Sequence, residues 1–410
     1  MNFPRSQSPL RSLTLLAPTL LALACAPASP PPVGEETEMN QDAFATPKQL
    51  EDRTAGLSPL LASDDLELVA ELPFPPGNVA VSDEGRVFFT FHPEGNRGSI
   101  EIAELIDGQP VAYPDEAFQK KAHTVLSLRV DSKGRLWLLD YGQLGLHRPR
   151  LSAIDLQTDQ VVLEYDLPSE AAPFGSMLND FQVSPAGDAI YISDQSLLRQ
   201  DQAIVVVDLS GPSPVARRRL QNHPSVKNGP YGVFVDGDLV TLGHFIRPKY
   251  GVDSIALDQS GDWLYYASLN AGELYRVATF DLEYEESGLS DAELADRVEF
   301  VAETTMSDGI ATDAEGNVYL TDMEHFALTR VSPEGELDLL LADERLRWPD
   351  GFGWAPDGHL YVTASALHEY LPDLIRTKDE MLDGGPYGIY RLMPQKACSD
   401  DQICRGAPGH

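Results

Sequence analysis

Short alternations of apolar and polar residues run through most of the chain and predict β-strands. Residues 307 to 325, SDGIATDAEGNVYLTDMEH, alternate on both sides of AEGN, a turn that contains glycine. A period of two broken by such a reversal is typical of a β-hairpin. Five further segments share this layout: GNVAVSDEGRVFFTF, SLRVDSKGRLWLLDYG, NDFQVSPAGDAIYISDQ, DSIALDQSGDWLYYAS and PDGFGWAPDGHLYVTAS, which begin at Gly77, Ser127, Asn179, Asp253 and Pro349. The chain therefore carries six copies of one hairpin.

The spacing of the copies leaves room for a second hairpin after each one. Second hairpins are visible as LSAIDLQTDQVVLEYDL, AIVVVDLSGPSPVARRRL and ALTRVSPEGELDLLL. Two hairpins per repeat make a four-stranded antiparallel sheet, and six such sheets arranged radially make an all-β, six-bladed β-propeller. The alternative is a β-sandwich in which the repeated turns are a coincidence.

A propeller has to close its ring. The segment DLELVAELPF, residues 65 to 74, precedes the first hairpin, and GPYGIYRLMP, residues 385 to 394, follows the last. We expect the N-terminal strand to join the sheet of the final blade, because this would cover an otherwise exposed edge.

The N-terminal region predicts export. Residues 1–24 carry two arginines and the apolar run LTLLAPTLLALA, which is too short to span a membrane and suits a signal peptide. The small residues before Cys25 resemble a bacterial lipoprotein box, with ordinary signal cleavage nearby as the alternative. Residues 25–60 are rich in Pro and acid and predict a flexible tether. We therefore expect a protein of the bacterial cell envelope, either lipid-anchored at the outer membrane or periplasm, or extracellular.

The propeller is expected over residues 61–396, followed by a tail at 397–410. Cys398 and Cys404 lie in this region, and in an oxidising compartment they predict a small disulfide. A zinc site is the weaker alternative, since no second Cys or His pair accompanies them.

Overall charge narrows the set of partners. The formal net charge of the 410 residues is −34, and Lys and Arg form no long basic run. Nucleic acid and an anionic membrane surface are therefore disfavoured as partners, apart from membrane contact through the predicted lipid anchor. We expect a monomer that binds a small molecule.

Polar residues stand where the innermost strand of each blade begins. In a propeller these positions point toward one axial opening, so their carboxylates and amides would converge there. Such oxygens suit calcium best among divalent cations, and clustered aspartates also need protons or a cation to limit their repulsion. The alternative is that they cap turns. The residues are Asn78, the neighbourhood of His123, Asn179, Asp180, Asp253, Asp308 and Asp350.

Other candidates follow the second strands or flank Asp350. Asp322, Glu324 and His325 lie on one loop, where His325 is a candidate general base or else a solvated turn residue. Trp348 and Phe352 are candidates for a flat ligand, with core packing as the alternative. No G-x-S-x-G, Walker or dinucleotide-binding motif stands in a suitable context, so neither a serine hydrolase nor a nucleotide cofactor is expected.

Several segments of the sequence resemble the major royal jelly/yellow protein family. They are RVDSKGRLWLLDYG, SMLNDFQVSPAGDAIYISD, SDGIATDAEGNVYLTDMEHFALTRVSPEG and RLRWPDGFGWAPDGHLYVTASALH, and the likeness covers roughly residues 65 to 395. The resemblance implies a six-bladed propeller. It also implies a small amphipathic ligand in the channel, such as a biogenic amine or sterol, or dopachrome-tautomerase-like activity.

A more distant resemblance is to the senescence-marker/gluconolactonase propellers. It implies a divalent cation held by Asn179, Asp253 and Asp308, with Asp308 as base. The family's first glutamate ligand falls on Pro76, which removes one anionic ligand, whereas Asp253 stands where an Asn is usual.

Three functions remain open. The leading hypothesis is a propeller that binds a small organic ligand, with ligand contacts from Asn78, Asp180, Asp322, Glu324, Trp348, Asp350 and Phe352, and with isomerase activity in which Asp308 and His325 act. The alternatives are a metal-dependent lactonase and a non-catalytic scaffold for protein interactions.

Overall fold

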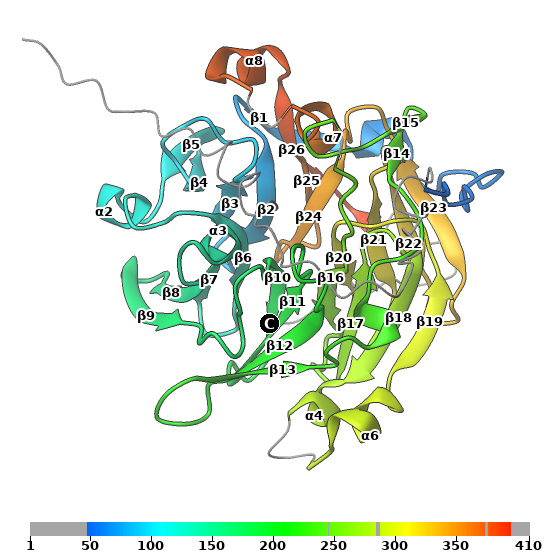
Figure 1. Ribbon diagram of the computed structural model, residues 1–410. Coiled ribbons are helices and arrows are strands. Elements are labelled where there is room, and N and C mark those ends of the chain that lie inside the picture. Colours follow the sequence, from blue (N-terminus) through cyan, green and yellow to red (C-terminus); the bar gives the residue numbers. More distant parts are fainter. Residues whose placement is uncertain (1–46, 245, 284–287, 374–375, 395–410) are drawn as a thin grey trace, which may run out of the picture. The chain divides into compact units, whose positions relative to one another are not determined.

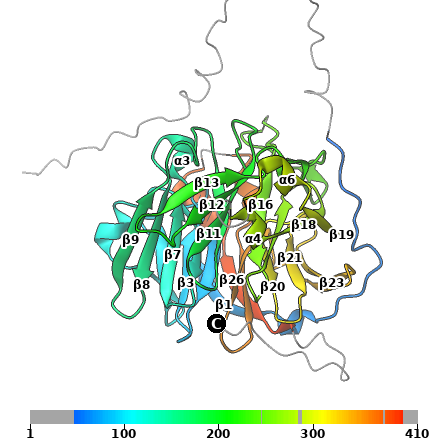
Figure 2. The same ribbon diagram turned by 90° about the horizontal axis from the view of Figure 1, so that it is seen from below.

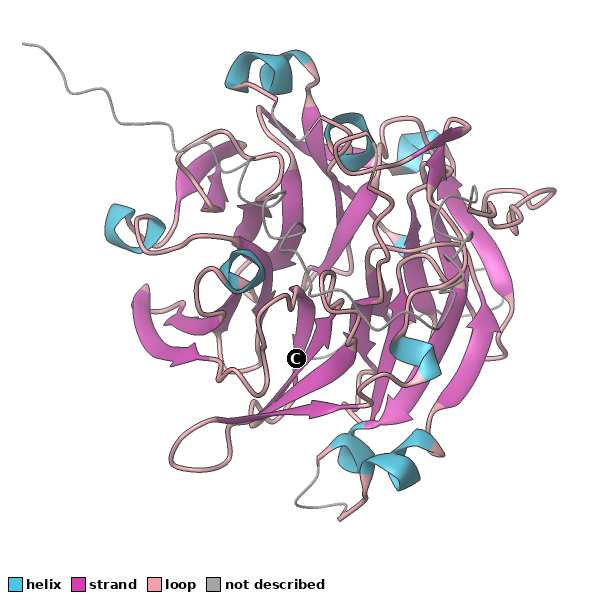
Figure 3. Cartoon of the chain, viewed as in Figure 1, coloured by secondary structure: helices cyan, strands magenta, loops and turns pink. Residues whose placement is uncertain are grey.

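The chain folds into a six-bladed β-propeller, as the repeats predicted. The computed structural model describes residues 47–244, 246–283, 288–373 and 376–394. Each blade is a four-stranded antiparallel sheet, and the innermost strands surround the centre (Figures 1 and 3). In the view of Figure 2 the sheets of neighbouring blades stand next to one another around the ring.

The strands of the blades follow one another along the chain. Blade one contains β2 (Pro76–Val81), β3 (Val87–Phe91), β4 (Ile102–Ile106) and β5 (Gln109–Ala112). Blade two contains β6 (Val125–Val130), β7 (Arg135–Asp140), β8 (Arg150–Asp155) and β9 (Gln160–Asp166). Blade three contains β10 (Leu178–Val183), β11 (Ala189–Asp194), β12 (Ala203–Asp208) and β13 (Val215–Arg219). Blade four contains β16 (Val252–Leu257), β17 (Trp263–Ser268), β18 (Glu273–Ala278) and β19 (Glu299–Glu303). Blade five contains β20 (Ile310–Thr312), β21 (Val318–Asp322), β22 (Ala327–Val331) and β23 (Leu337–Ala342).

Blade six joins the two ends of the propeller. Its strands are β24 (Pro349–Trp354), β25 (Leu360–Ala364), β26 (Tyr387–Leu392) and β1 (Glu67–Leu72), with β1 as the outer strand beside β26. The N-terminal strand thus completes the last sheet, as the sequence predicted. Because β26 is paired on both sides, this blade has no open edge there.

The remaining elements are short. A small hairpin, β14 (Phe234–Val235) and β15 (Asp238–Leu239), follows blade three in the sequence, and its Phe234 N–H bonds to Glu324 on a loop of blade five. The helices are η3 (Ser63–Asp65), α2 (Glu116–Gln119), α3 (Gly142–Gly145), η4 (Pro224–Val226), α4 (Thr279–Leu282), α6 (Asp291–Ala295), α7 (Leu367–Tyr370) and α8 (Lys378–Asp383). In the described part of the chain no helix has the length and apolar character needed to cross a membrane.

Five of the six inner strands have a register shift near their first residues. On β10, for example, Asn179 and Asp180 together face one residue of the neighbouring strand, Ser193. This two-against-one pairing is a β-bulge, which bends the strand and re-aims side chains. Similar shifts follow Pro76 of β2, Val125 of β6, Val252 of β16 and Pro349 of β24. The bulges therefore fall on the residues that begin these five inner strands.

Hydroxyl groups opposite the bulges tie each blade to the next one. Thr90 Oγ1 accepts the Asn78 N–H and donates to the Leu126 carbonyl of blade two at 2.8 Å. Thr363 Oγ1 makes the equivalent bond from blade six to the Gly77 carbonyl of blade one at 2.5 Å. These bonds satisfy backbone groups that the bulges leave unpaired.

Close approach around the axis explains two glycines of the repeated motifs. A Cβ atom on Gly309 of the SDG motif would lie 1.9 Å from the Asp350 carbonyl oxygen, and one on Gly351 would lie 2.9 Å from the Asn78 Cα. No side chain fits at either distance, so only glycine lets the neighbouring inner strands pack this closely.

Residues 47–60, the end of the predicted tether, pack against the propeller. The Gly232 N–H donates to the Lys48 carbonyl, and Leu60 and Leu61 N–H groups donate to carbonyls of β23. Leu50 and Leu61 are buried. The sequence placed these residues in the tether because they are polar on average, but two well-spaced leucines suffice to anchor the segment. Residues 1–46, with the predicted signal peptide and Cys25, and residues 395–410, with Cys398 and Cys404, lie outside the described residues.

Candidate functional site

A cavity of about 200 Å³ opens where the inner strands begin. We call this end of the propeller the mouth. The cavity is lined by Asn78, His92, Glu94, Leu126, Ser127, Tyr141, Leu144, Met177, Asn179, Asp180, Gln195, Leu197, Leu242, Tyr250, Asp253, Leu269, Asp308, Gly309, Trp348, Asp350, Gly351, Leu367 and Leu371.

The lining has two chemically different parts. Residues at the starts of the inner strands are mostly polar, with amides, a serine and four aspartates. Loop residues around the mouth are mostly apolar and include six leucines. A small ligand with a polar head and an apolar body would therefore meet matching surfaces on both parts.

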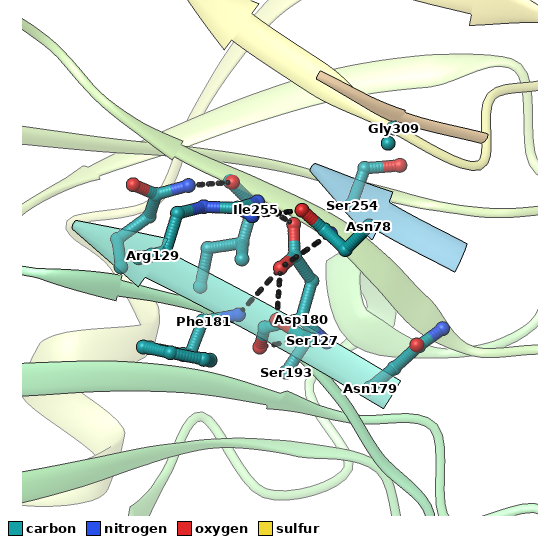
Figure 4. Close-up of polar contacts among 12 residues, drawn as sticks. Asn78, Ser127, Arg129, Asn179, Asp180, Phe181, Ser193, Ser254, Ile255 and Gly309 are labelled. Carbon is teal, nitrogen blue, oxygen red and sulfur yellow. Dashed lines mark hydrogen bonds and ion pairs between the residues drawn. The ribbon is translucent and has the colours of Figure 1, made fainter. Parts of the chain in front are cut away.

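One aspartate on the polar part is fully paired. Arg129 donates to the Asp180 carboxylate at 2.5 Å and also reaches the Asn78 side-chain oxygen (Figure 4). Ser127 Oγ donates to Asp180 at 2.7 Å. Burial raises the pKa of Asp180, while the Arg129 charge opposes this shift. Asp180 and Arg129 thus form a buried ion pair that connects three blades.

Three further aspartates have no such counter-charge, and we call Asp253, Asp308 and Asp350 the axial cluster. Within the described part of the chain, none of them forms an ion pair with Lys or Arg. Asp253 is 1% exposed, and its Oδ2 atom and that of Asp350 have no hydrogen-bond partner. Burial raises the pKa of both well above the ordinary value, and the negative charge of Asp308 raises the pKa of both further.

Asp308 is linked directly to other members of the lining. Trp348 Nε1 donates to its Oδ2 atom at 2.5 Å, and Asp308 also shares a hydrogen bond with Asp253. Burial raises the pKa of Asp308, and the Trp348 bond opposes that shift. Asn179 Nδ2 donates to Asp253. The charge of Asp308 raises the pKa of Asp253, so the pair favours a state in which one of the two carboxyls is protonated.

The sequence analysis missed His92 and Glu94, which form a second polar group at the mouth. His92 Nδ1 lies 2.9 Å from Glu94 Oε2, and Tyr141 Oη donates to Glu94 Oε1 at 3.0 Å. Burial opposes ionisation of Glu94, but the His92 ring holds the pKa of this carboxyl below its ordinary value. These residues follow β3 on a loop without a repeated motif, so no sequence pattern marked them. At the start of the inner strand of blade two the lining residues are Leu126 and Ser127 rather than His123, which stacks on His147.

The predicted site residues divide into two groups. Asn78, Asn179, Asp180, Asp253, Asp308, Trp348 and Asp350 line the cavity. Asp322, Glu324, His325 and Phe352 do not. Phe352 packs in a hydrophobic cluster with Leu360 and Val362, which is the core alternative.

Asp322, Glu324 and His325 form a separate group that we call the loop cluster. His325 Nδ1 lies 2.9 Å from Asp322 Oδ2, and Glu324 accepts the Phe234 N–H at 2.7 Å. The hydrogen bond to Asp322 raises the pKa of His325 to about 9, and burial raises the pKa of Glu324 to about 7. His325 therefore holds a loop in place and lies apart from Asp308, its predicted catalytic partner.

Some of these residues carry oxygen atoms that are suitable ligands for a divalent cation. The unpartnered oxygens of Asp253 and Asp350 are hard donors of the kind that calcium prefers. However, among the described residues no three His, Cys, Asp or Glu side chains are grouped as metal ligands. The Asn179, Asp253 and Asp308 set does come together, and its role as a metal site stays a prediction.

Comparisons with solved structures find other propellers at low identity. A calcium-binding protein, regucalcin, from Agrobacterium tumefaciens is 15% identical, with 80% of this chain and 92% of that chain covered and a TM-score of 0.49. A gluconolactonase from Xanthomonas campestris is 14% identical, with 80% and 89% covered and a TM-score of 0.49. Identities and TM-scores of this size indicate a shared fold and do not indicate a shared ligand or activity. No curated protein matches the chain.

The match to a family is more extensive. Residues 123–370 match the sequence profile described as Major royal jelly protein. This range spans more than half of the chain and includes five of the six inner strands that begin at the cavity. The chain belongs to the major royal jelly protein family.

Proposed function

We propose that the axial cavity binds a small amphipathic organic molecule that carries a positive charge, such as an aromatic amine. The observation that carries this proposal is the axial cluster, three aspartates of the cavity lining that have no Lys or Arg partner among the described residues and lie beside the leucines of the same lining. An ammonium group would neutralise the cluster and occupy the unpartnered oxygens of Asp253 and Asp350. The apolar body of the ligand would contact the leucines and Trp348.

The charge balance supports a cation rather than a neutral ligand. Asp180 already has Arg129, and Glu94 has His92, so neither needs a further partner. Burial and the charge of Asp308 raise the pKa of Asp253 and of Asp350, so ionisation of the cluster is unfavourable. A bound cation would offset the unfavourable ionisation, because an opposite charge in a buried site favours the ionised form of the carboxyls.

Titration calorimetry with matched ligands tests the proposal. Dopamine and serotonin are compared with their N-acetyl forms, which keep the ring and lose the charge. We expect at least one amine to bind and its acetylated form to bind about tenfold more weakly or not at all. No heat from either amine, or equal affinity for the acetylated forms, would contradict the proposal.

A pair of variants assigns the binding to the axial cluster. Asp350→Asn removes one carboxylate from the cluster, whereas Asp322→Asn removes one from the loop cluster. Amine affinity should fall for Asp350→Asn and stay unchanged for Asp322→Asn, which does not line the cavity. Equal losses in both variants would place the ligand elsewhere.

The hydrogen-bonded pair Asp253 and Asp308 favours a second candidate, an isomerase that moves a proton within the bound ligand. In such a reaction the ionised carboxyl takes a proton from one ligand atom and the protonated carboxyl delivers one to another. The test is tautomerisation of dopachrome. Asp308→Asn should lower kcat far more than it raises KM, whereas an unchanged kcat would remove this candidate.

A different measurement distinguishes a metal-dependent lactonase from the binding protein and the isomerase. Elemental analysis of the purified protein, together with turnover of aldonolactones with and without chelator, tests it directly. Stoichiometric calcium and chelator-sensitive turnover would support Asn179, Asp253 and Asp308 as ligands. A metal-free protein without lactone turnover would remove this function.

A further inference from the structure

The loops of blades two to four at the mouth expose apolar side chains on the outside as well as toward the cavity. Leu146 is 59% exposed, Phe174 is 56% exposed and Leu198 is 48% exposed. They are neighbours in space: a Cβ on Gly145 would meet Phe174 at 2.9 Å, and one on Gly175 would meet Leu198 at 3.1 Å. Three side chains of this size make a contiguous exposed apolar patch, which on a soluble protein marks an interaction surface.

The patch continues around the mouth and into the cavity. Ile246 is 48% exposed and is bonded through its backbone to Leu242, which lines the cavity. Likewise Leu146 and Leu198 follow the cavity residues Leu144 and Leu197 along the chain. We call Leu146, Phe174, Leu198 and Ile246 the apolar rim. It forms one apolar surface with the leucine lining of the cavity.

The loops that carry the apolar rim have an unusual charge for this protein. The stretches YGQLGLHRPR, AAPFGSML, QSLLRQ and LVTLGHFIRPKYG contain no Asp or Glu, although the chain has 64 acidic residues. Exposed cations lie among the apolar side chains, namely Arg148, Arg199, Arg247 and Lys249. The net charge of −34 argued against an anionic surface as a partner, but these four stretches themselves carry only positive charges. Asp201 and Asp373 lie beside them and pair with Arg199 and His244. Charge at the contact decides association, since exposed charges beyond about 10 Å are screened by salt.

The start of the described chain lies at the same end of the propeller. A Cβ on Gly232 would meet the Pro47 side chain at 2.7 Å, and one on Gly272 would meet Leu50 at 2.7 Å. Gly272 stands between β17 and β18, on the turn that follows the cavity residue Leu269. The described chain thus begins at the mouth end of the propeller.

We infer that the apolar rim docks the mouth on an anionic lipid surface, with the leucines and Phe174 in the headgroup region and the surrounding cations on lipid phosphates. Interleaved apolar and basic side chains are the combination that binds a membrane interface without spanning it. The cavity would then open directly onto the lipid. Docking does not depend on the proposed amine ligand, but the two together would let a membrane-dissolved cationic amphiphile enter the cavity without crossing water.

Vesicle co-sedimentation tests the inference with the full chain carrying Cys25→Ser, so that a lipid anchor cannot cause binding. Vesicles of phosphatidylcholine with phosphatidylglycerol are compared with vesicles of phosphatidylcholine alone. We expect stronger binding to the anionic vesicles, with weakening as salt is raised. Absence of binding to the anionic vesicles would overturn the inference.

Matched variants locate the contact. The rim variant Leu146→Ser/Phe174→Ser/Leu198→Ser should lose most of the binding, and Arg148→Ala and Lys249→Ala should each weaken it about fivefold. The controls lie at the opposite end of the blades: Phe280→Ser, 56% exposed on α4, matches the apolar changes, and Lys133→Ala matches the charge changes. Controls that lose as much binding as the rim variants would overturn the inference.

Two further readouts keep the result unambiguous. Melting temperatures of all variants should stay close to that of the parent chain, because every changed side chain is exposed. Sedimentation equilibrium checks the other use of an apolar face. A dimer that forms in solution and disappears in the rim variant would overturn lipid docking and assign the apolar rim to an interface between copies.

Discussion

The axial cluster and the loop cluster contain similar acidic residues, but they differ in how those charges are balanced. In the loop cluster, Asp322 is bonded to His325 and Glu324 accepts a backbone N–H. In the axial cluster, Asp253 and Asp350 each keep one buried oxygen without a partner. The acids of the loop cluster are therefore bonded within the protein, whereas the axial cluster keeps carboxylate oxygens without partners in the cavity lining.

The difference teaches that burial of acids alone does not mark a binding site. A buried carboxylate with its partners supplied stabilises the fold, whereas one without partners costs stability and is retained for another reason. Asp180, held by Arg129, belongs with the first kind although it lies in the cavity wall. The following experiments test this distinction, beginning with the largest expected effect.

Removing the partner of a paired acid should be the most damaging change. Arg129→Met leaves Asp180 buried without its counter-charge, and we expect a loss of about 3–5 kcal/mol in the free energy of unfolding. Denaturant unfolding measures this loss. The double variant Arg129→Met/Asp180→Asn should recover much of it, since no buried charge then remains. A single variant as stable as the parent protein would show that Asp180 is not held in this way.

Equivalent Asp→Asn changes in the two clusters should shift stability in opposite directions. Asp322→Asn should cost about 1–3 kcal/mol, because a buried charge-assisted bond to His325 is weakened. Asp350→Asn should raise stability at neutral pH, because burial and the charge of Asp308 oppose ionisation of Asp350, and its Oδ2 atom has no hydrogen-bond partner comparable to the bond between Asp322 and His325. Both values come from paired unfolding curves, and the same sign for both would break the comparison.

The loop cluster should also contribute to the pH dependence of the free energy of unfolding. The pKa of His325 is raised from 6.5 to about 9 by its bond to Asp322. Its contribution is therefore fully present below pH 6.5 and is lost as pH rises through about 9. Unfolding curves across this window should show a decline that is smaller in His325→Gln. An identical decline in both proteins would remove His325 from this role.

The smallest effect concerns the tuning of the axial cluster. Trp348→Phe removes the donor that opposes the raised pKa of Asp308. If a cationic ligand binds the ionised cluster, its affinity should rise with pH, and this rise should move to higher pH in the variant, because the Trp348 bond opposes the raised pKa of Asp308. Titration with a quaternary aromatic ammonium, which cannot lose its charge, measures the profile. An unchanged profile would separate Trp348 from the electrostatics of the site.

The fold could be predicted from the sequence because the information is local and repeated. Alternation on both sides of glycine turns gave the hairpins, and six copies in one phase left few architectures. The first residues of the inner strands, such as Asp253 and Asp350, could also be placed, since topology alone brings them to one axis.

The rest of the site depends on contacts that spacing does not encode. His92 and Glu94 reach the cavity on a loop whose course follows from packing, and Arg129 is recognisable as a partner of Asp180 only when two blades are side by side. His325 illustrates the opposite case, because an acidic loop with a histidine looks catalytic until the bond to Asp322 is visible. Pattern identifies which residue types are present, and tertiary contacts decide whether they are already satisfied.

The pairing of β1 with β26 has a consequence for how the molecule is made. β1 leaves the ribosome before any other blade strand, yet the strand beside it, residues 387 to 392, is synthesised after all the rest. Five blades can form from neighbouring segments, while the sixth waits for two distant ends to meet, which is the slowest kind of contact to establish. The ring can therefore close at blade six only after the whole propeller has been synthesised.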